Sequence, residues 1–319
     1  MRLIRRLFRK LLFKVIVLAI SLAVLAIGFL NIAKFVIYPQ YYFIKSDLCT
    51  NPGLGDGFVC QGIAANEEND VILVSGYMKK HSASRIYVTN AENESYYVSL
   101  KQGEEKFTGH AGGIATTGGV VYISSEGKVF TLSLESVLNA NSGDELDIGE
   151  GIEVNNQADF AYTDDTYLYV GEFHDGEKYT IEGHENETAE GTHYAICSVY
   201  ALDDLTKPVK VYSVRDKVQG ICFTPDGKVV MSTSYGLNDS VYYVYNLENA
   251  TDSGKTFDGA PLYYLDQLEK EVNGPAMSEG LDYRDGKVIT MSESASNKYL
   301  FGKLFFANKI VELNFDKLM

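Results

Sequence analysis

Apolar and polar residues follow one pattern that occurs five times after residue 55. In each copy a small residue precedes an apolar one, and a short polar stretch then leads to an apolar run. In the first copy Gly62-Ile63 is followed by Val71-Ile72-Leu73-Val74-Ser75. Short apolar runs bounded by turn residues predict strands. The small residues of the five copies are Gly62, Gly113, Ala158, Gly220 and Gly280.

The spacing of these copies leaves room for four strands in each. A repeat of this size built from strands is typical of a β-propeller, in which each copy forms one blade. We therefore expect an all-β, five-bladed β-propeller over residues 38–319, with six blades as the alternative because the third copy is long. The tyrosine-rich segment 262–265 is the predicted fourth strand of the fourth copy, and residues 266–272 are predicted to be helical.

The fifth copy ends before it reaches a fourth strand. An open propeller would leave an unpaired strand edge, so another part of the chain must complete the last blade. Residues 41–46, which begin Tyr-Tyr-Phe-Ile, have the composition of the other outer strands. They are predicted to close the ring.

The N-terminus predicts a membrane anchor. Residues 1–14 hold six basic side chains and form the predicted cytoplasmic segment, followed by a transmembrane helix over residues 15–35. The uncharged run 15–33 spans about 28 Å as a helix, close to the thickness of a bilayer core. The flanking basic residues favour a cytoplasmic N-terminus and an extracytoplasmic, extracellular propeller in the cell membrane. A cleavable signal peptide is the alternative interpretation.

The net charge limits the expected partners, and the cysteine positions predict a disulfide. The chain carries a net charge of −15, and its first 14 residues hold six of the 28 basic residues and no acidic one, so the remainder carries −21. Nucleic acid is therefore not expected as a partner, since phosphates require clustered Lys and Arg. Cys49 and Cys60 flank a turn-rich loop and are predicted to form a disulfide. Cys197 and Cys222 either pair or remain buried thiols.

Aligning the copies places polar side chains in register at one mouth of the predicted channel. Such side chains either satisfy neighbouring backbone groups or hydrogen-bond a small polar ligand and coordinate a hard cation such as Ca²⁺ or another divalent ion. Residues just before the small residue, or near it, are Gln61, His110, Gln157, Gln219 and Glu279. Residues after the second strands are Tyr77, Glu126, Glu172, Tyr235 and Glu293.

The third copy also contains an insertion that is rich in histidine and glutamate. His174, His184 and His193 lie within it. Side chains of these types can bind zinc, but their spacing fits no metal motif, so a solvated acidic loop is the preferred interpretation.

Two phrases resemble a known group of propellers. The segments 218–227 and 278–286, each ending in Asp-Gly, are similar to the repeats of NHL-type, YncE-like and SMP-30/gluconolactonase-like proteins. The resemblance implies a propeller over residues 40–319. It also implies, for gluconolactonase-like members, a channel metal held by Glu, Asn and Asp, and only Glu279 matches that pattern. Five-bladed propellers include a membrane-anchored calcium-dependent nucleotidase, which is similar in architecture alone.

Two function classes follow from these features. The favoured one is a membrane-anchored propeller that binds a small polar ligand or a surface protein. The alternative is a metal-assisted hydrolase of the lactonase or esterase, glycosidase or nucleotidase-like kind, with its site in the central channel.

Overall fold

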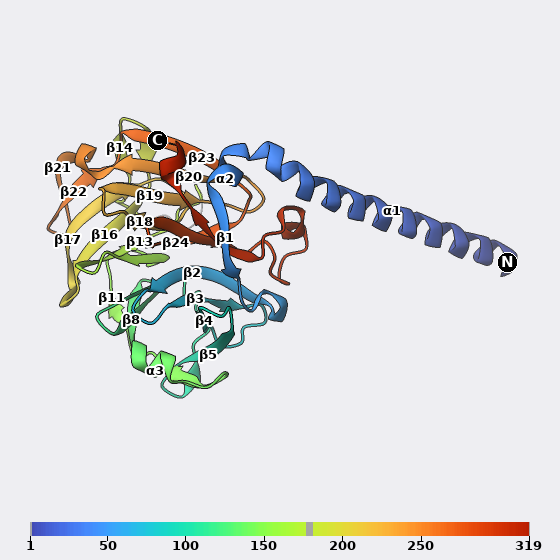
Figure 1. The fold of residues 1–319 in the computed structure, drawn as a ribbon, viewed down its shortest axis with the longest axis horizontal. Helices are drawn as coiled ribbons and strands as arrows, with labels where there is room; N and C mark the ends of the chain where they lie inside the picture. Colours follow the sequence, from blue (N-terminus) through green and yellow to red (C-terminus); the bar gives the residue numbers. More distant parts are fainter. Residues whose placement is uncertain (1, 177–180, 319) are drawn as a thin grey trace.

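Five blades surround one axis, each an antiparallel sheet whose first strand lies innermost (Figure 1). The computed structural model describes residues 2–176 and 181–318. The predicted five-bladed propeller is confirmed. From the axis outward, the strands are β2 (Phe58–Asn66), β3 (Val71–Met78), β4 (Arg85–Asn90) and β5 (Ser95–Gln102) in blade 1; β7 (Gly113–Thr117), β8 (Val120–Ser125), β9 (Lys128–Ser133) and β11 (Ile152–Glu153) in blade 2; β12 (Phe160–Thr163), β13 (Tyr167–Gly171), β16 (Ala195–Ala201) and β17 (Asp204–Val214) in blade 3; β18 (Val218–Phe223), β19 (Lys228–Thr233), β20 (Ser240–Asn246) and β23 (Leu268–Gly274) in blade 4; and β24 (Ser278–Arg284), β25 (Lys287–Ser292), β26 (Lys309–Leu313) and β1 (Lys45–Thr50) in blade 5.

Several shorter strands and helices lie beside or between the main strands of the blades. Strand β10 adds to blade 1 in parallel with β5, and β6 pairs with β5 from the other side of a tight turn. Strands β14 and β15 form a separate hairpin inside the insertion of blade 3. The bounds of these elements are β6 (Glu105–Lys106), β10 (Glu145–Asp147), β14 (Asn186–Thr188), β15 (Gly191–His193), α3 (Leu134–Leu138), η1 (Leu54–Asp56), η2 (Leu247–Asn249), η3 (Phe301–Phe305) and η4 (Phe315–Leu318).

The inner strands touch one another at the small residue of each repeat. A Cβ atom added to Gly220 would lie 2.5 Å from the backbone nitrogen of Leu281 in the next blade. One added to Gly113 would lie 2.1 Å from the nitrogen of Ala161. Both distances are shorter than atoms can approach, so these positions admit no side chain. At these glycines the backbones of neighbouring inner strands therefore pack directly against each other.

The hairpins between first and second strands have turn residues with positive φ values. Asp285 and Gly286 join β24 to β25 with φ values of 49° and 77°. Gly118 and Gly119 join β7 to β8 with φ values of 56° and 79°. Two consecutive positive φ values match the twist of a two-residue hairpin, which explains the Asp-Gly and Gly-Gly pairs in the sequence.

The ring is closed by an N-terminal strand, but its position differs from the predicted one. Residues 41–44 belong to helix α2 (Pro39–Ile44), and β1 begins only at Lys45. Strand β1 pairs antiparallel with β26, from Lys45 opposite Leu313 to Thr50 opposite Lys309. The predicted strand 41–46 is therefore wrong for its first four residues. Tyr41 and Ile44 are buried because they pack beneath the blades from a helical turn, not because they pair in a sheet.

The outer part of blade 4 also corrects the sequence interpretation. Strand β22 (Ala260–Tyr264) pairs in parallel with β17 of blade 3, and β21 (Thr251–Phe257) lies outside it. The fourth strand of blade 4 is instead β23, which covers the segment predicted to be helical. The β21–β22 hairpin thus leaves blade 4 and extends the sheet of its neighbour.

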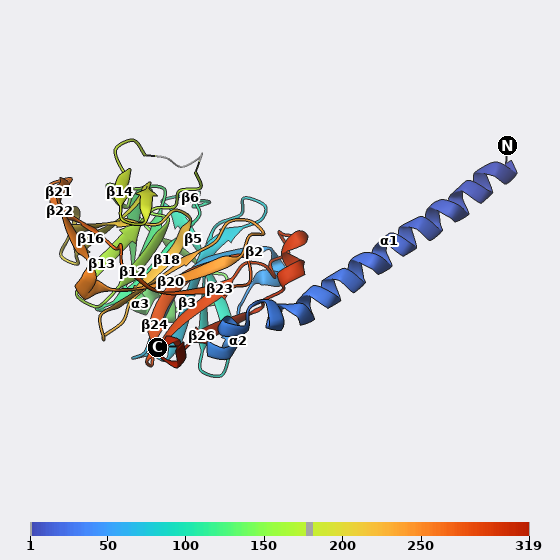
Figure 2. The same ribbon diagram turned by 90° about the horizontal axis from the view of Figure 1, so that it is seen from above.

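Helix α1 (Arg2–Ile37) projects from the body beside blade 5 (Figures 1 and 2). Its segment from residue 5 to residue 37 is long and apolar enough to cross a membrane, and its apolar window is not buried by the propeller. The limits 15–35 of the membrane-spanning part remain a prediction. At its C-terminal end, Tyr38 donates a hydrogen bond to Asp239 at 2.6 Å and so joins the helix to blade 4.

The predicted disulfide is absent. All four cysteines lie in the described part of the chain, and all four are free thiols. The Sγ atom of buried Cys60 accepts a hydrogen bond from Asn51 Nδ2 at 3.2 Å, and Cys49 lies in β1 of another blade. The loop between them is held by its own backbone and by blade 5, so the Gly- and Pro-rich spacing does not require a covalent link.

Candidate functional site

The polar column before the small residues is built on irregular strand pairing. The register between first and second strands shifts at Gln61 in blade 1, at Gln219 in blade 4 and at Glu279-Gly280 in blade 5. A β-bulge leaves the extra residue outside the ladder and redirects its side chain. The bulges explain why polar residues are tolerated at the start of otherwise apolar inner strands.

Glu279, which is buried, and Glu293, which is partly buried, have interacting carboxyl groups where blade 5 meets blade 1. Glu279 is only 2% exposed. Burial, followed by the charge of Glu293, raises the pKa of Glu279 well above its ordinary value. Burial also raises the pKa of Glu293 to about 7. Protonation of at least one of the two groups at neutral pH relieves the repulsion between them.

The two carboxyl groups differ in their hydrogen bonds. Glu293 Oε2 accepts one hydrogen bond from Gln61 Nε2 at 3.3 Å and one from the hydroxyl of Tyr299 at 3.0 Å. The carboxyl group of Glu279 has no hydrogen-bond partner among residues 2–176 and 181–318. The carboxyl oxygens of Glu279 are not among the fully enclosed, unpaired side-chain atoms of the described residues, so they remain within reach of water, an ion or a ligand.

Aromatic and basic side chains complete the site. Lys298 Nζ lies 4.3 Å from the ring centre of Tyr77 and 5.0 Å from that of Tyr299. The hydroxyls of Tyr77 and Tyr299 are 3.3 Å apart, and the ring of His110 lies 4.7 Å from that of Tyr77. Burial, followed by the charge of Lys298, lowers the pKa of His110. We call the assembled group the mouth cluster: Gln61, Tyr77, His110, Glu279, Glu293, Lys298 and Tyr299.

The structure thus brings five of the ten predicted site residues together, from blades 1 and 5 and from the loop before blade 2. Lys298 and Tyr299 were missed, because they lie in the loop between β25 and β26 and have no counterpart in the other repeats. The charge of Glu126 also acts on His110, but its side chain is exposed.

The remaining predicted residues have other surroundings. Gln219 Nε2 donates to the carbonyl of Ser234 at 3.3 Å, which is the backbone-satisfying alternative. Tyr235 packs with its ring centre 6.1 Å from that of Phe173. Gln157 accepts a backbone hydrogen bond from Gly127 through its carbonyl, and the structure gives its side chain no contact with the mouth cluster. No hydrogen bond or ring contact joins these three side chains to the mouth cluster within residues 2–176 and 181–318, and their part in ligand binding stays a prediction.

Glu172 belongs to the histidine-rich insertion. Its Oε1 atom is 2.5 Å from His184 Nδ1 and accepts a hydrogen bond from the backbone nitrogen of Ile196. His174 Nδ1 lies 3.3 Å from Asp216 Oδ2, and burial lowers the pKa of His193. Residues 177–180 of the insertion lie outside the described residues. His174 and His184 therefore each pair with a different carboxyl group.

Within residues 2–176 and 181–318, no group of three or more His, Cys, Asp or Glu side chains is arranged to hold a metal ion. At the mouth cluster the oxygen donors are the two carboxyl groups and the amide of Gln61. A metal ion at Glu279 stays a prediction that would require further ligands from water or substrate.

A second concavity lies at the other end of the channel. A cavity of about 670 Å³ is lined by the loops that join first to second strands in all five blades. Its lining includes Glu67, Glu68, Asp164, Asp165 and Asp282, and burial raises the pKa of Asp282 to about 7. The carboxyl of Asp282 accepts hydrogen bonds from the backbone nitrogens of Ala65 and Tyr283, so it joins blades 1 and 5. None of the ten predicted site residues lines this cavity.

Comparisons with known proteins identify the fold and not a family. No family model matches the chain, and no curated protein matches it. A PQQ-bound aldose sugar dehydrogenase from Streptomyces coelicolor is 14% identical over 77% of this chain and 76% of that one, with a TM-score of 0.46. A putative oxidoreductase (glucose dehydrogenase) from Thermus thermophilus is 11% identical over 84% and 99%, with a TM-score of 0.45.

Hydrazine synthase from Kuenenia stuttgartiensis is also similar, at 11% identity over 73% of this chain and a TM-score of 0.37. The match covers 55% of that protein, so this chain spans little more than half its length. At these identities the likeness is one of propeller fold alone.

Proposed function

We propose that this protein is a membrane-anchored, extracytoplasmic propeller that binds a small polar ligand at the mouth cluster. The observation that supports it best is the carboxyl group of Glu279, which is buried and has no hydrogen-bond partner within the described residues. A hydrogen bond from a ligand to this carboxyl group contributes about 0.5–1.5 kcal/mol when the group is neutral and about 1.5–3 kcal/mol when it is ionised.

The charges of the mouth cluster define the chemistry of the ligand. Two carboxyl groups face a single lysine, Lys298, which is largely exposed. A ligand with an amine, several hydroxyls or a bound cation fits this arrangement better than an anion. The rings of Tyr77 and Tyr299 offer an apolar wall beside the carboxyl groups, which suits an amine or a polyol with a hydrocarbon skeleton.

A thermal-shift screen of the full chain in detergent tests this proposal. Ligands would include calcium, zinc, amines, sugars, lactones and nucleotides, because a ligand at a hundred times its dissociation constant stabilises by about 2.7 kcal/mol. Glu279→Gln should weaken a hit that carries positive charge by at least tenfold. The matched control Glu153→Gln, at an exposed position of β11, should leave affinity unchanged. A hit that is equally tight for both variants would place the binding site elsewhere.

The hydrolase alternative keeps one specific observation in its favour. Two adjacent carboxyl groups with raised pKa values can share acid and base roles. This alternative requires turnover of a lactone, ester, glycoside or phosphate that is lost in both Glu279→Gln and Glu293→Gln. Dependence of that turnover on calcium or another divalent cation would support a metal-assisted reaction. Binding without turnover would support the ligand-binding proposal.

A further inference from the structure

The end of helix α1 is tied to the segment between β25 and β26. Asn31 Nδ2 donates to the carbonyls of Lys303 and Leu304, both at 3.3 Å. One turn further along, Lys34 Nζ donates to the carbonyl of Phe306 at 3.0 Å. The 3₁₀ turn η3 is thereby held against α1 at the end of the uncharged run 15–33. If α1 spans a bilayer, η3 lies at the depth of the lipid headgroups.

The side chains of this segment suit that depth. Leu300 is 79% exposed and Phe301 is 66% exposed, although both are large and apolar. Phe306 and, on α1 itself, Phe35 are also exposed. Such an apolar patch is costly in water, but exposed aromatic and aliphatic residues next to a membrane span commonly insert into the interfacial layer.

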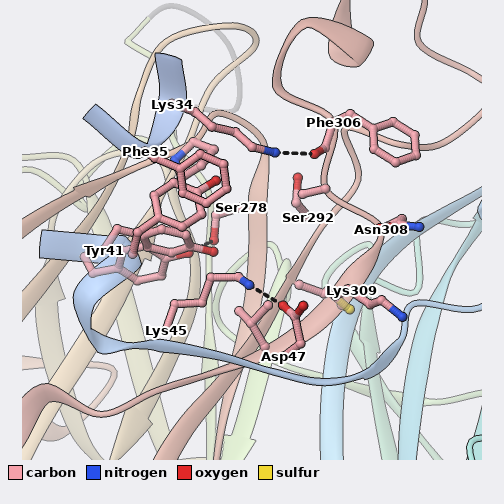
Figure 3. Close-up of a pocket in the computed structure, with 16 residues that line it drawn as sticks. Lys34, Phe35, Tyr41, Lys45, Asp47, Ser278, Ser292, Phe306, Asn308 and Lys309 are labelled. Atoms are coloured by element: carbon pink, nitrogen blue, oxygen red, sulfur yellow. Dashed lines mark hydrogen bonds and ion pairs between the residues drawn. The ribbon is translucent and has the colours of Figure 1, made fainter. Parts of the chain in front are cut away.

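A basic pocket lies beside this apolar patch. A cavity of about 260 Å³ between the end of α1 and blade 5 is lined by Lys34, Lys45 and Lys309, with Asp47 as its one acidic residue (Figure 3). Lys45 pairs with Asp47, and Lys309 Nζ donates to Thr50 Oγ1 at 3.0 Å. The pocket keeps a net positive charge, although residues 15–319 together carry −21.

The rim of the pocket joins it to the apolar patch. Phe35 and Phe306 both line it, as do the buried hydroxyl groups of Ser278 and Ser292 and the exposed amide of Asn308 (Figure 3). A ligand that fits must therefore offer a negative, hydrogen-bonding group to the lysines and an apolar part to the rings. A phospholipid has both parts in this order, and at this depth it is the molecule present at highest concentration.

We propose that this junction pocket holds the phosphate headgroup of an anionic phospholipid while Leu300 and Phe301 insert beside it. The inference rests on the proposed membrane anchoring of α1. It gives the propeller a second contact with the bilayer, so the body cannot rotate freely about its anchor. The inserted segment also follows directly on Lys298 and Tyr299, and it therefore connects the bilayer contact to the mouth cluster.

The chain has no tryptophan, so a single introduced one reports its own surroundings. Phe301→Trp, Phe29→Trp in α1 and Val209→Trp on blade 3 would each be placed in the full chain and reconstituted in vesicles with brominated lipid, which quenches tryptophan on contact. Quenching of Phe301→Trp and Phe29→Trp, with Val209→Trp unaffected, is the expected result. If only Phe29→Trp is quenched, the proposed insertion of Leu300 and Phe301 is contradicted, whereas membrane anchoring by α1 is supported. No quenching of Phe29→Trp overturns the anchor itself.

Headgroup selection is tested with Phe306→Trp at the rim of the pocket. Brominated phosphatidylglycerol at one tenth of the lipid should quench it more strongly than brominated phosphatidylcholine at the same fraction. Lys45→Gln with Lys309→Gln should reduce this preference, by about fivefold for each lysine. Lys207→Gln, exposed on blade 3, serves as the matched control and should change nothing. Equal quenching by the two lipids in the parent protein would overturn the headgroup site.

Discussion

Single glycines set how closely neighbouring blades approach. At Gly113 an added Cβ would meet the backbone of blade 3 at 2.1 Å, and backbone atoms cannot move aside as a flexible side chain can. Overpacking of this kind costs about 1–3 kcal/mol, and more where the backbone must shift. We expect Gly113→Ala to lower the free energy of unfolding in urea by at least that amount. Gly55→Ala, where a Cβ meets nothing within 4 Å, should be close to neutral; an equal loss in both variants would contradict the explanation.

The raised pKa of Glu293 predicts a pH dependence of stability. A carboxyl group with a folded-state pKa of about 7 keeps its proton in the folded state after the unfolded chain, with a pKa near 4.5, has lost it. The contribution of Glu293 to the free energy of unfolding therefore falls as the pH rises from about 4.5 to about 7, and it stays low above that range.

Glu293→Gln removes this titration. Between pH 5 and pH 7.5 the parent protein should lose about 1–3 kcal/mol more stability than the variant, as measured by urea unfolding at a series of pH values. Asp159 and Asp282, whose pKa values burial raises to about 6 and about 7, are present in both proteins and add a common slope. Parallel curves for the two proteins would show that Glu293 is ionised at neutral pH.

A site residue can be found from the sequence when its position recurs in the aligned copies of the repeat. Gln61 and Glu279 precede the small residue of their copies, so alignment of the copies finds them. Tyr77 and Glu293 follow second strands and are found in the same way. Lys298 and Tyr299 occupy a loop that occurs once, and only the folded chain brings them to Glu293. Alignment also selects Gln219 and Tyr235, which contact Ser234 and Phe173, and their role in binding stays a prediction.

At the scale of elements, inner strands are predictable and outer strands are not. The second strands are buried almost throughout and give apolar runs, and each follows a first strand that is marked by its small residue. Strand β23 has the sequence Leu-Glu-Lys-Glu-Val-Asn-Gly and exposes most of its residues, so its pattern resembles a polar helix. Charged outer strands are common because they discourage pairing with other molecules. The apolar β22 was assigned to blade 4 because it follows β20 in sequence, whereas it pairs with blade 3.

Strand β1 is the element on which ring closure depends. Three chains that begin at residues 38, 45 and 51 separate its contribution from that of α2. Loss of residues 38–44 removes buried Tyr38, Tyr41 and Ile44, and further loss of residues 45–50 removes every hydrogen bond from β1 to β26. We expect a second, separate drop in unfolding midpoint between the chains that begin at 45 and at 51. Identical midpoints for these two chains would show that blade 5 is stable with three strands.

For the whole molecule, the anchoring proposal predicts a defined orientation. Protease added to intact cells should digest the propeller, while an epitope placed in residues 1–14 stays protected by the membrane. Permeabilised cells supply the control, in which both parts are digested. Digestion of the N-terminal epitope alone would show the opposite orientation.

The order in which the chain is made gives the β1–β26 pairing a further consequence. Thr50 leaves the ribosome early, whereas its partner Lys309 lies 259 residues later. At typical rates of about 5–20 residues per second, β1 waits roughly 10–50 s for the strand that pairs with it. During that time the nascent body is an unfinished arc with open strand edges, and under the anchoring proposal α1 already holds it at the bilayer. A chain cut short before β26 would remain in that state and become a substrate for quality-control proteases at the membrane.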